Sequence, residues 1–148
     1  MENKSSQIEK LFFNTRLQTI SLCKDLEPED MVLQTAENVS PIKWHLGHTT
    51  WFFEKFILSE LDENYKPFNK EYNFIFNSYY NSVGQFNPRN KRGNLNRPLL
   101  KDVIKYRDYV TENIIGFTKK SKNNRISFLV ELGLNHEQQH QELMLMDI

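Results

Sequence analysis

The residues best suited to chemistry in this 148-residue chain are its 4 histidines, which fall in two short windows. The first window is WHLGH at 44–48, and the second is HEQQHQE at 136–142. Residues four apart on a helix lie one above the other on the same face, with Cβ atoms about 5–6 Å apart. If the second window is helical, His136 and His140 therefore form a pair of imidazole ligands for one metal ion.

The apolar residues around the second window predict which face the two histidines occupy. Steps of three or four connect Leu129, Leu132, His136, His140 and Leu143, so we expect the histidines on the buried stripe of a helix. Buried imidazoles need polar partners, because an unsatisfied buried polar group costs about 1–3 kcal/mol. A metal ion satisfies both rings at once. The alternative is a pair of core histidines bonded to carboxylates or carbonyls.

The first window offers the third ligand, either His45 or His48. These residues are three apart and diverge by about 60° around a helix axis, so both border the site but one points into it better. Three imidazoles with open coordination positions suit Zn²⁺, Fe²⁺, Ni²⁺ or Cu²⁺.

Two glycines lie beside the histidine windows. Gly47 is next to His48, and Gly133 lies about one turn before His136. A glycine in a helix interior costs about 1 kcal/mol relative to alanine. Both positions are therefore expected to need a close backbone approach or open space for a ligand.

The elements that must position these residues are helices. Apolar spacing predicts four long helical segments at about 6–25, 41–61, 99–117 and 124–148. Ser40 followed by Pro41 predicts a cap residue and a proline at the first helical position of the second segment. A short helical start is expected at 28–30, and residues 62–98 form a long, Asn-rich connection with at most a short helix near 74–83. No segment alternates as a strand would, so we expect an all-α four-helix bundle with one long crossover between helices two and three.

The long connection is basic. From residue 72 to residue 101 it has no Asp or Glu, and its five cations are Arg89, Lys91, Arg92, Arg97 and Lys101. A guanidinium presents a planar fork that grips a carboxylate or phosphate through two hydrogen bonds. Long ordered crossovers often carry function, and a solvated polar loop is the alternative. The cluster is short, and 19 basic residues balance 19 acidic ones, so nucleic acid is not an expected partner.

Composition limits the remaining function classes. The chain is long enough for one domain, residues 1–148, with 39% hydrophobic and 26% charged residues. No apolar run approaches the ~18 residues that span a bilayer, and the N-terminus lacks the apolar stretch of a signal peptide, so no membrane partner is expected. Cys23 is the only cysteine, which excludes an internal disulfide and favours a reducing cytoplasmic location.

Three segments together resemble a known family. They are SPIKWHLGHTTWFFE at 40–54, FNSYYNSVG at 76–84 and ELGLNHEQQHQEL at 131–143. In this order they resemble the N-terminal DinB-like domain of the ergothioneine-pathway sulfoxide synthases, and the resemblance covers nearly the whole chain. The His-x-x-x-His-x-Glu pattern alone would indicate only the wider DinB-like superfamily.

The resemblance implies a bundle fold and a mononuclear non-haem iron site. By motif position the Fe²⁺ ligands are His48, His136 and His140, with Zn²⁺ or another divalent metal as the alternative. His45 occupies a place where other members carry Asp.

The resemblance also implies a substrate site. Arg89 and Arg92 match loop arginines that hold the carboxylates of the thiol substrate, γ-glutamylcysteine or cysteine. Gln139 matches a position near the second substrate, trimethylhistidine. The implied reaction uses O2 to join the cysteine sulfur to trimethylhistidine and to oxidise it to a sulfoxide.

In this family a second domain of formylglycine-generating-enzyme type follows the bundle and supplies the active-site tyrosine. The present sequence stops at 146–148 inside an apolar helical pattern, so we expect an interrupted sequence whose C-terminal-type domain is separate. On this interpretation no catalytic residue lies in the chain, and it does not complete turnover alone. Two alternatives are a free-standing DinB-like metalloprotein acting as a thiol transferase or hydrolase, and a non-catalytic remnant that binds metal.

Overall fold

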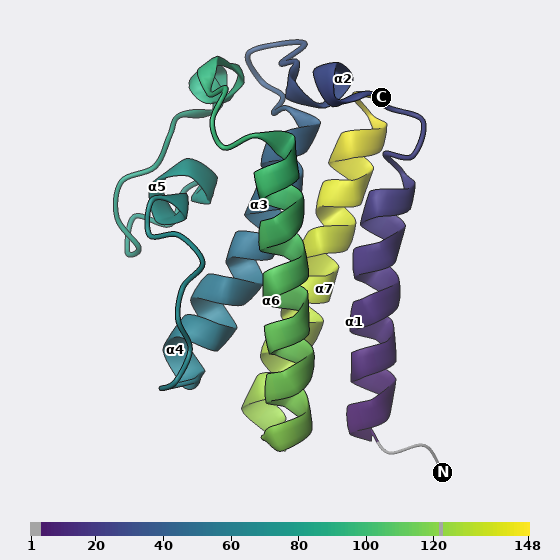
Figure 1. The fold of residues 1–148 in the computed structure, drawn as a ribbon, viewed down its shortest axis with the longest axis vertical. Coiled ribbons are helices and arrows are strands. Elements are labelled where there is room, and N and C mark those ends of the chain that lie inside the picture. The colour runs from purple at the N-terminus through teal and green to yellow at the C-terminus, as the bar shows by residue number, and fades with distance from the viewer. Residues whose placement is uncertain (1–3, 122) are drawn as a thin grey trace.

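A computed structural model describes residues 4–121 and 123–148, and over these residues the chain is all-helical without a strand. This confirms the all-α prediction. Four long segments lie side by side in Figure 1: α1 (Lys4–Ser21), α3 (Ile42–Phe53), α6 (Leu100–Lys120) and α7 (Asn124–Leu145). α3 continues through the π-helical turn η1 (Glu54–Leu58) into α4 (Ser59–Leu61). The shorter elements are α2 (Pro28–Val32), α5 (Tyr72–Phe76) and the 3-10 helix η2 (Arg89–Asn94).

The long helices pack because each buries an apolar row. α1 packs along α7, and α3 packs against both α6 and α7. The shared core is rich in aromatic and branched side chains, among them Phe12, Trp51, Phe53, Ile57, Val103, Tyr106, Val110, Ile114, Val130 and Met144. None of the described helices is both long enough and apolar enough to cross a membrane.

The long connection contains the one short helix that the sequence allowed there, α5, which covers Tyr72–Phe76, and residues 89–94 form a 3-10 helix that the sequence did not predict. One local expectation was wrong. Ser40 does not cap α3, which begins at Ile42 without a side-chain cap. The hydroxyl of Ser40 is buried and accepts a hydrogen bond of 2.8 Å from Nη1 of Arg92. Pro41 occupies the N-cap position, so Ser40 lies one residue before it and its hydroxyl bonds to the crossover residue Arg92.

A buried ionic cluster connects all four long segments. Glu137 on α7 is fully buried and forms ion pairs of 2.9 Å with Arg16 on α1 and with Arg107 on α6. Arg16 also donates to Thr50 on α3 at 2.8 Å. Burial alone would raise the pKa of Glu137, but Arg16 and Arg107 together lower it to about 2. The cluster is therefore an ionised carboxylate between two guanidinium groups.

The start of the crossover is fixed to the core by Glu54, the first residue of the π-helical turn. Its buried carboxylate accepts hydrogen bonds from the Tyr65 hydroxyl at 2.5 Å, from the Phe68 N–H at 3.0 Å and from the Tyr106 hydroxyl. A buried carboxylate with three donors is satisfied without a cation. These bonds hold the chain after α4 against α6.

The end of the crossover is fixed by Lys43 on α3. Its ammonium group donates to three backbone carbonyls, those of Leu95 at 3.1 Å, Asn96 at 3.4 Å and Pro98 at 2.9 Å. The segment that carries η2 is thereby held across the N-terminal half of α3, where the first histidine window lies.

Candidate metal centre

The structure brings the three predicted ligands together from two helices. His48 lies on α3, His136 and His140 lie on α7, and one ring nitrogen from each lies within 4.8 Å of the others. The Nε2 atoms of His48 and His136 are 3.1 Å apart. Two imidazole nitrogens that bind one ion at about 2.1 Å and at roughly tetrahedral or right angles are about 3.0–3.4 Å apart. The Nε2 atoms of His48 and His136 therefore already have the spacing of two ligands on one ion.

The prediction of which row of α7 is buried was wrong, because a neighbouring row on the helix faces the core. Leu132 and Leu143 are 45% and 41% exposed, while the buried row runs through Ile126, Val130, Gly133, Leu134, Glu137 and Met144. Steps of three and four trace either of two neighbouring rows on a helix, and packing against α1 and α3 selected the second row. His136 and His140 therefore lie beside the buried row, half-buried, where a ligand can reach them.

Hydrogen bonds orient the rings. Nδ1 of His48 is 2.6 Å from the carbonyl oxygen of Phe76, so this nitrogen carries the proton and Nε2 presents its lone pair toward His136. Nδ1 of His140 is 2.8 Å from Nδ1 of His45, so one of the two donates. When His140 donates, its Nε2 is left free to bind a metal. His45 thus contacts a ligand histidine and stands outside the three-residue cluster.

The protonation states suit metal binding. Burial lowers the pKa of His136 to about 4, and burial together with the charge of Arg92 lowers that of His45 to about 4. Burial and then the neighbouring histidines lower the pKa of His140 to about 2 and that of His48 well below its usual value. All four imidazoles are therefore neutral near pH 7, the form that binds a metal. Three neutral nitrogen donors fit a first-row divalent ion.

The two glycines give aromatic rings close access to the helices. A Cβ at Gly47 would lie 2.1 Å from the ring of Phe76, and a Cβ at Gly133 would lie 2.4 Å from the ring of Phe53. The expected close approach therefore occurs, although a ring makes it and no ligand space opens there. At Gly47 the approach has a consequence for the site, because Phe76 also supplies the carbonyl that orients His48.

A cavity of about 420 Å³ opens above the histidine cluster. The residues predicted to bind substrate line it together with the cluster: Arg89, Arg92 and Gln139. Trp44, Tyr79 and Tyr80 also contribute to its wall. Among the described residues, His48, His136 and His140 are the one group of three or more His, Cys, Asp or Glu close enough to hold a metal ion. The cavity therefore joins a metal-type donor set to two cationic side chains.

Arg92 is a buried cation without a counter-charge. It is 4% exposed, its Nη1 donates to Ser40, and within the described residues it forms no salt bridge and its Nε has no hydrogen-bond partner. Burial and then the nearby Arg89 lower its pKa to about 10, so it stays cationic at neutral pH. A buried charge is costly unless an opposite charge meets it. Arg92 therefore has the properties of an anion-binding group, which a solvated loop residue would not have.

Arg89 is the outer of the two cations. Its guanidinium donates to the Tyr79 hydroxyl and lies 5.7 Å from the centroid of that ring. Gln139 is exposed at the rim of the same cavity. Both positions face a ligand that would enter from solvent.

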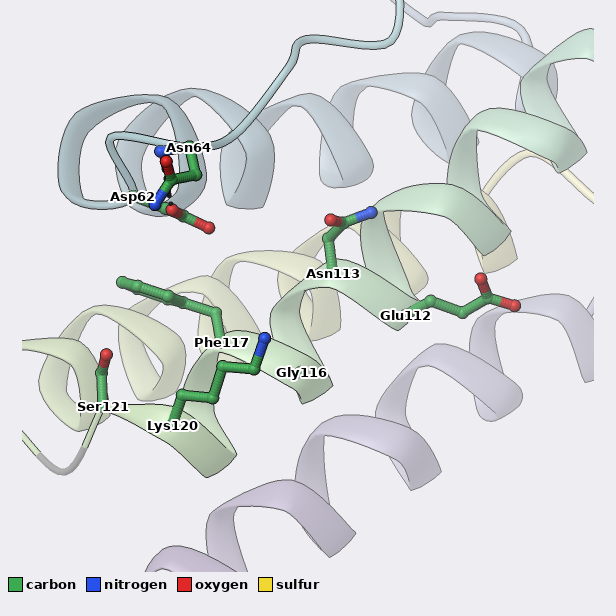
Figure 2. Close-up of a pocket in the computed structure, with 8 residues that line it drawn as sticks. All are labelled: Asp62, Asn64, Glu112, Asn113, Gly116, Phe117, Lys120 and Ser121. Carbon is green, nitrogen blue, oxygen red and sulfur yellow. Dashed lines mark hydrogen bonds between the residues drawn. The ribbon is translucent and has the colours of Figure 1, made fainter.

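A second hollow, of about 500 Å³, lies away from the histidines beside the end of α4 and the C-terminal part of α6 (Figure 2). Its charged side chains are Asp62, Glu112 and Lys120, and it has no histidine or cysteine. Two carboxylates and one ammonium on an open surface are an ordinary solvated arrangement. The histidine cavity is therefore the candidate site.

Sequence reasoning missed the buried role of Glu137, the bond between Ser40 and Arg92, and the place of Tyr79 and Tyr80 in the cavity wall. Glu137 gave a signal only in hindsight, as an acidic residue inside the histidine window. Compared with models of known protein families and with curated proteins, the sequence matches none of them.

Proposed function

We propose that this chain is the metal-binding domain of an iron(II)- and O2-dependent sulfoxide synthase that joins a cysteine-containing thiol to trimethylhistidine in ergothioneine biosynthesis. The observation that supports this function best is one cavity lined by His48, His136 and His140 together with Arg89 and Arg92. The finer fold assignment, a DinB-like four-helix bundle with one long crossover, belongs to the same proposal. It is supported by the four long segments and by the connection from residue 62 to 99.

Each group has a part that follows from its chemistry. The three histidines would hold Fe²⁺, which when bound supplies the activation of O2. Arg92, which has no salt bridge to any described residue, would bind a carboxylate of γ-glutamylcysteine or cysteine, and Arg89 would bind a second one nearer to solvent. With the carboxylates held on this side of the cavity, the sulfur is directed toward the histidines. Trp44, which is buried, forms an apolar part of the cavity wall next to His48.

The proposed enzyme also needs a second domain, which would cover the cavity. Gln139, Leu143 and Met146 line the mouth of the cavity, and Met146 is 83% exposed. A C-terminal-type domain on this side would enclose trimethylhistidine and supply the tyrosine that the family uses. We therefore assign metal binding and thiol binding to this chain, and no catalytic residue.

Nitric oxide, which binds ferrous iron in place of O2, gives a direct test. Purified chain is loaded anaerobically with Fe²⁺, treated with nitric oxide and measured by electron paramagnetic resonance. We expect the signal of an iron–nitrosyl complex, and its shape should change when γ-glutamylcysteine is added, because a thiol held in the cavity would alter the surroundings of the iron. Arg92→Ala should keep the signal and require roughly 10–100 times more thiol for the same change, the cost of one charge-assisted hydrogen bond. A signal that does not change when the thiol is added would contradict the proposal. Conjugation of the thiol with Zn²⁺ as the only metal would favour the alternative function, a thiol transferase.

A further inference from the structure

Arg92, Trp44 and His48 form one continuous stack from the cationic side of the cavity to the metal ligands. Cζ of Arg92 lies 3.5 Å from the centroid of the Trp44 ring. The rings of Trp44 and His48 are stacked, with centroids 4.4 Å apart and planes 12° apart. Two groups at these distances would overlap if they shared one face of the indole. Arg92 and His48 therefore lie on opposite faces of Trp44.

The backbone of α5 fixes both rings of this stack. Nε1 of Trp44 donates to the carbonyl of Ile75 at 2.9 Å, and Nδ1 of His48 donates to the next carbonyl, that of Phe76, at 2.6 Å. Trp44 is buried, so its plane has little freedom. The position of the guanidinium is thereby tied to the position of a metal ligand through one rigid ring.

The stack also holds the positive charge of Arg92 close to His48, one of the three clustered histidines. Arg92 carries one charge, and a divalent ion on His48 would bring the other. The buried indole contacts both Arg92 and His48, so part of the space between the two charges is apolar and their repulsion is screened less than it would be in solvent. An anion bound to Arg92 removes this repulsion and favours the ion at the histidines.

We propose, on the basis of the function proposed above, that Trp44 is a positioning residue that couples anion binding at Arg92 to metal binding at His48. The coupling is positive and reciprocal: occupation of either site raises the affinity of the other by the same factor. The thiol substrate would thus strengthen the metal site through its carboxylates, before and apart from any contact between its sulfur and the ion.

The test measures Co²⁺ affinity by calorimetry, with and without γ-glutamylalanine, which keeps the carboxylates and lacks the sulfur. In the parent chain we expect the dipeptide to tighten Co²⁺ binding about tenfold, within the usual range for coupled sites. Arg92→Gln should bind Co²⁺ at least as tightly without the dipeptide and show no enhancement with it. Trp44→Leu should bind Co²⁺ but show less than a twofold enhancement. Trp44→Phe, which keeps a ring between the two groups, should retain most of it.

Trp51 supplies the matched control, because its ring also stacks on His48, at 5.7 Å, and it does not contact Arg92. Trp51→Leu, the same replacement at the control position, should keep the full enhancement. Equal enhancement in Trp44→Leu and the parent, or equal losses at Trp44 and Trp51, would overturn the role of Trp44. If Trp44→Leu does not fold, Arg92→Gln decides: an enhancement of Co²⁺ binding that persists in this variant would overturn the coupling between Arg92 and His48. Binding of both ligands without any enhancement in the parent refutes the coupling and leaves the proposed function standing, whereas absence of Co²⁺ or dipeptide binding refutes both.

Discussion

Replacing Glu137 by Gln tests whether the buried ionic cluster holds the four long segments together. The substitution keeps the size of the side chain and removes the charge that faces Arg16 and Arg107, each paired with it at 2.9 Å. Two guanidinium groups would then be buried close to one another without an anion. The NH2 group of the amide would also face an N–H donor of one of them. Breaking a buried pair by removal of one partner costs about 3–5 kcal/mol. We expect Glu137→Gln to lose stability of this size.

Urea unfolding of the metal-free chain at pH 7 measures this loss. With a slope of about 2 kcal/mol per molar urea, the midpoint should fall by roughly 1.5–2.5 M. Glu142→Gln is the matched control, since it removes an exposed carboxylate from the same helix and should change stability by less than about 0.5 kcal/mol. The triple change Arg16→Met, Glu137→Leu and Arg107→Met should be close to neutral, because it removes all three charges together. A Glu137→Gln midpoint within 0.5 M of the parent, a bound taken from about 1 kcal/mol and the same slope, would refute the reasoning.

Two further predictions concern pH and packing. The pKa values of His45 and His136 are lowered to about 4 in the folded chain, so the unfolded chain binds protons first as the pH falls. The stability of the metal-free chain should therefore decrease between about pH 6.5 and 4, and a urea midpoint that stays constant over that window would contradict the burial of these rings. The lowered pKa of Glu137 means that its contribution is fully present above about pH 4.5 and is lost only as the pH falls toward 2. Gly47→Ala should destabilise the chain by about 1–3 kcal/mol and weaken metal binding, because its Cβ would lie 2.1 Å from the Phe76 ring. Gly116→Ala, with nothing within 4 Å of its Cβ, should instead gain up to about 1 kcal/mol, and thermal unfolding that ranks the two variants in the opposite order would contradict this packing.

The helices and the histidine pairing could be predicted because both depend on local spacing. Apolar residues at steps of three and four predict a helix whichever row is buried, and His136 and His140 share a face in any helix. The choice of row could not be predicted from the same spacing. Leu132 and Leu143 look like core residues in the sequence, yet α1 and α3 pack against the neighbouring row and leave both partly exposed.

The charged residues show a second limit of the sequence. Glu137 and Arg92 would each be placed on a surface by residue type alone. Glu137 is buried because Arg16 and Arg107, distant in the sequence, meet it from two other helices. Arg92 is buried because Trp44 and Ser40 surround its guanidinium. Such partners are set by tertiary packing, which no local pattern contains.

Metal binding by the four single histidine variants tests the central assignment most directly. Purified chain, titrated anaerobically with Fe²⁺ or with Co²⁺ as a surrogate, should bind about one equivalent of metal. His48→Ala, His136→Ala and His140→Ala should each abolish tight binding, since each removes one nitrogen of the cluster whose donor atoms lie within 4.8 Å of one another. His45→Ala should weaken binding much less, because His45 contacts the ring of His140 and lies outside the cluster. Equal losses at His45 and His48, or full binding after either change on α7, would contradict the assignment.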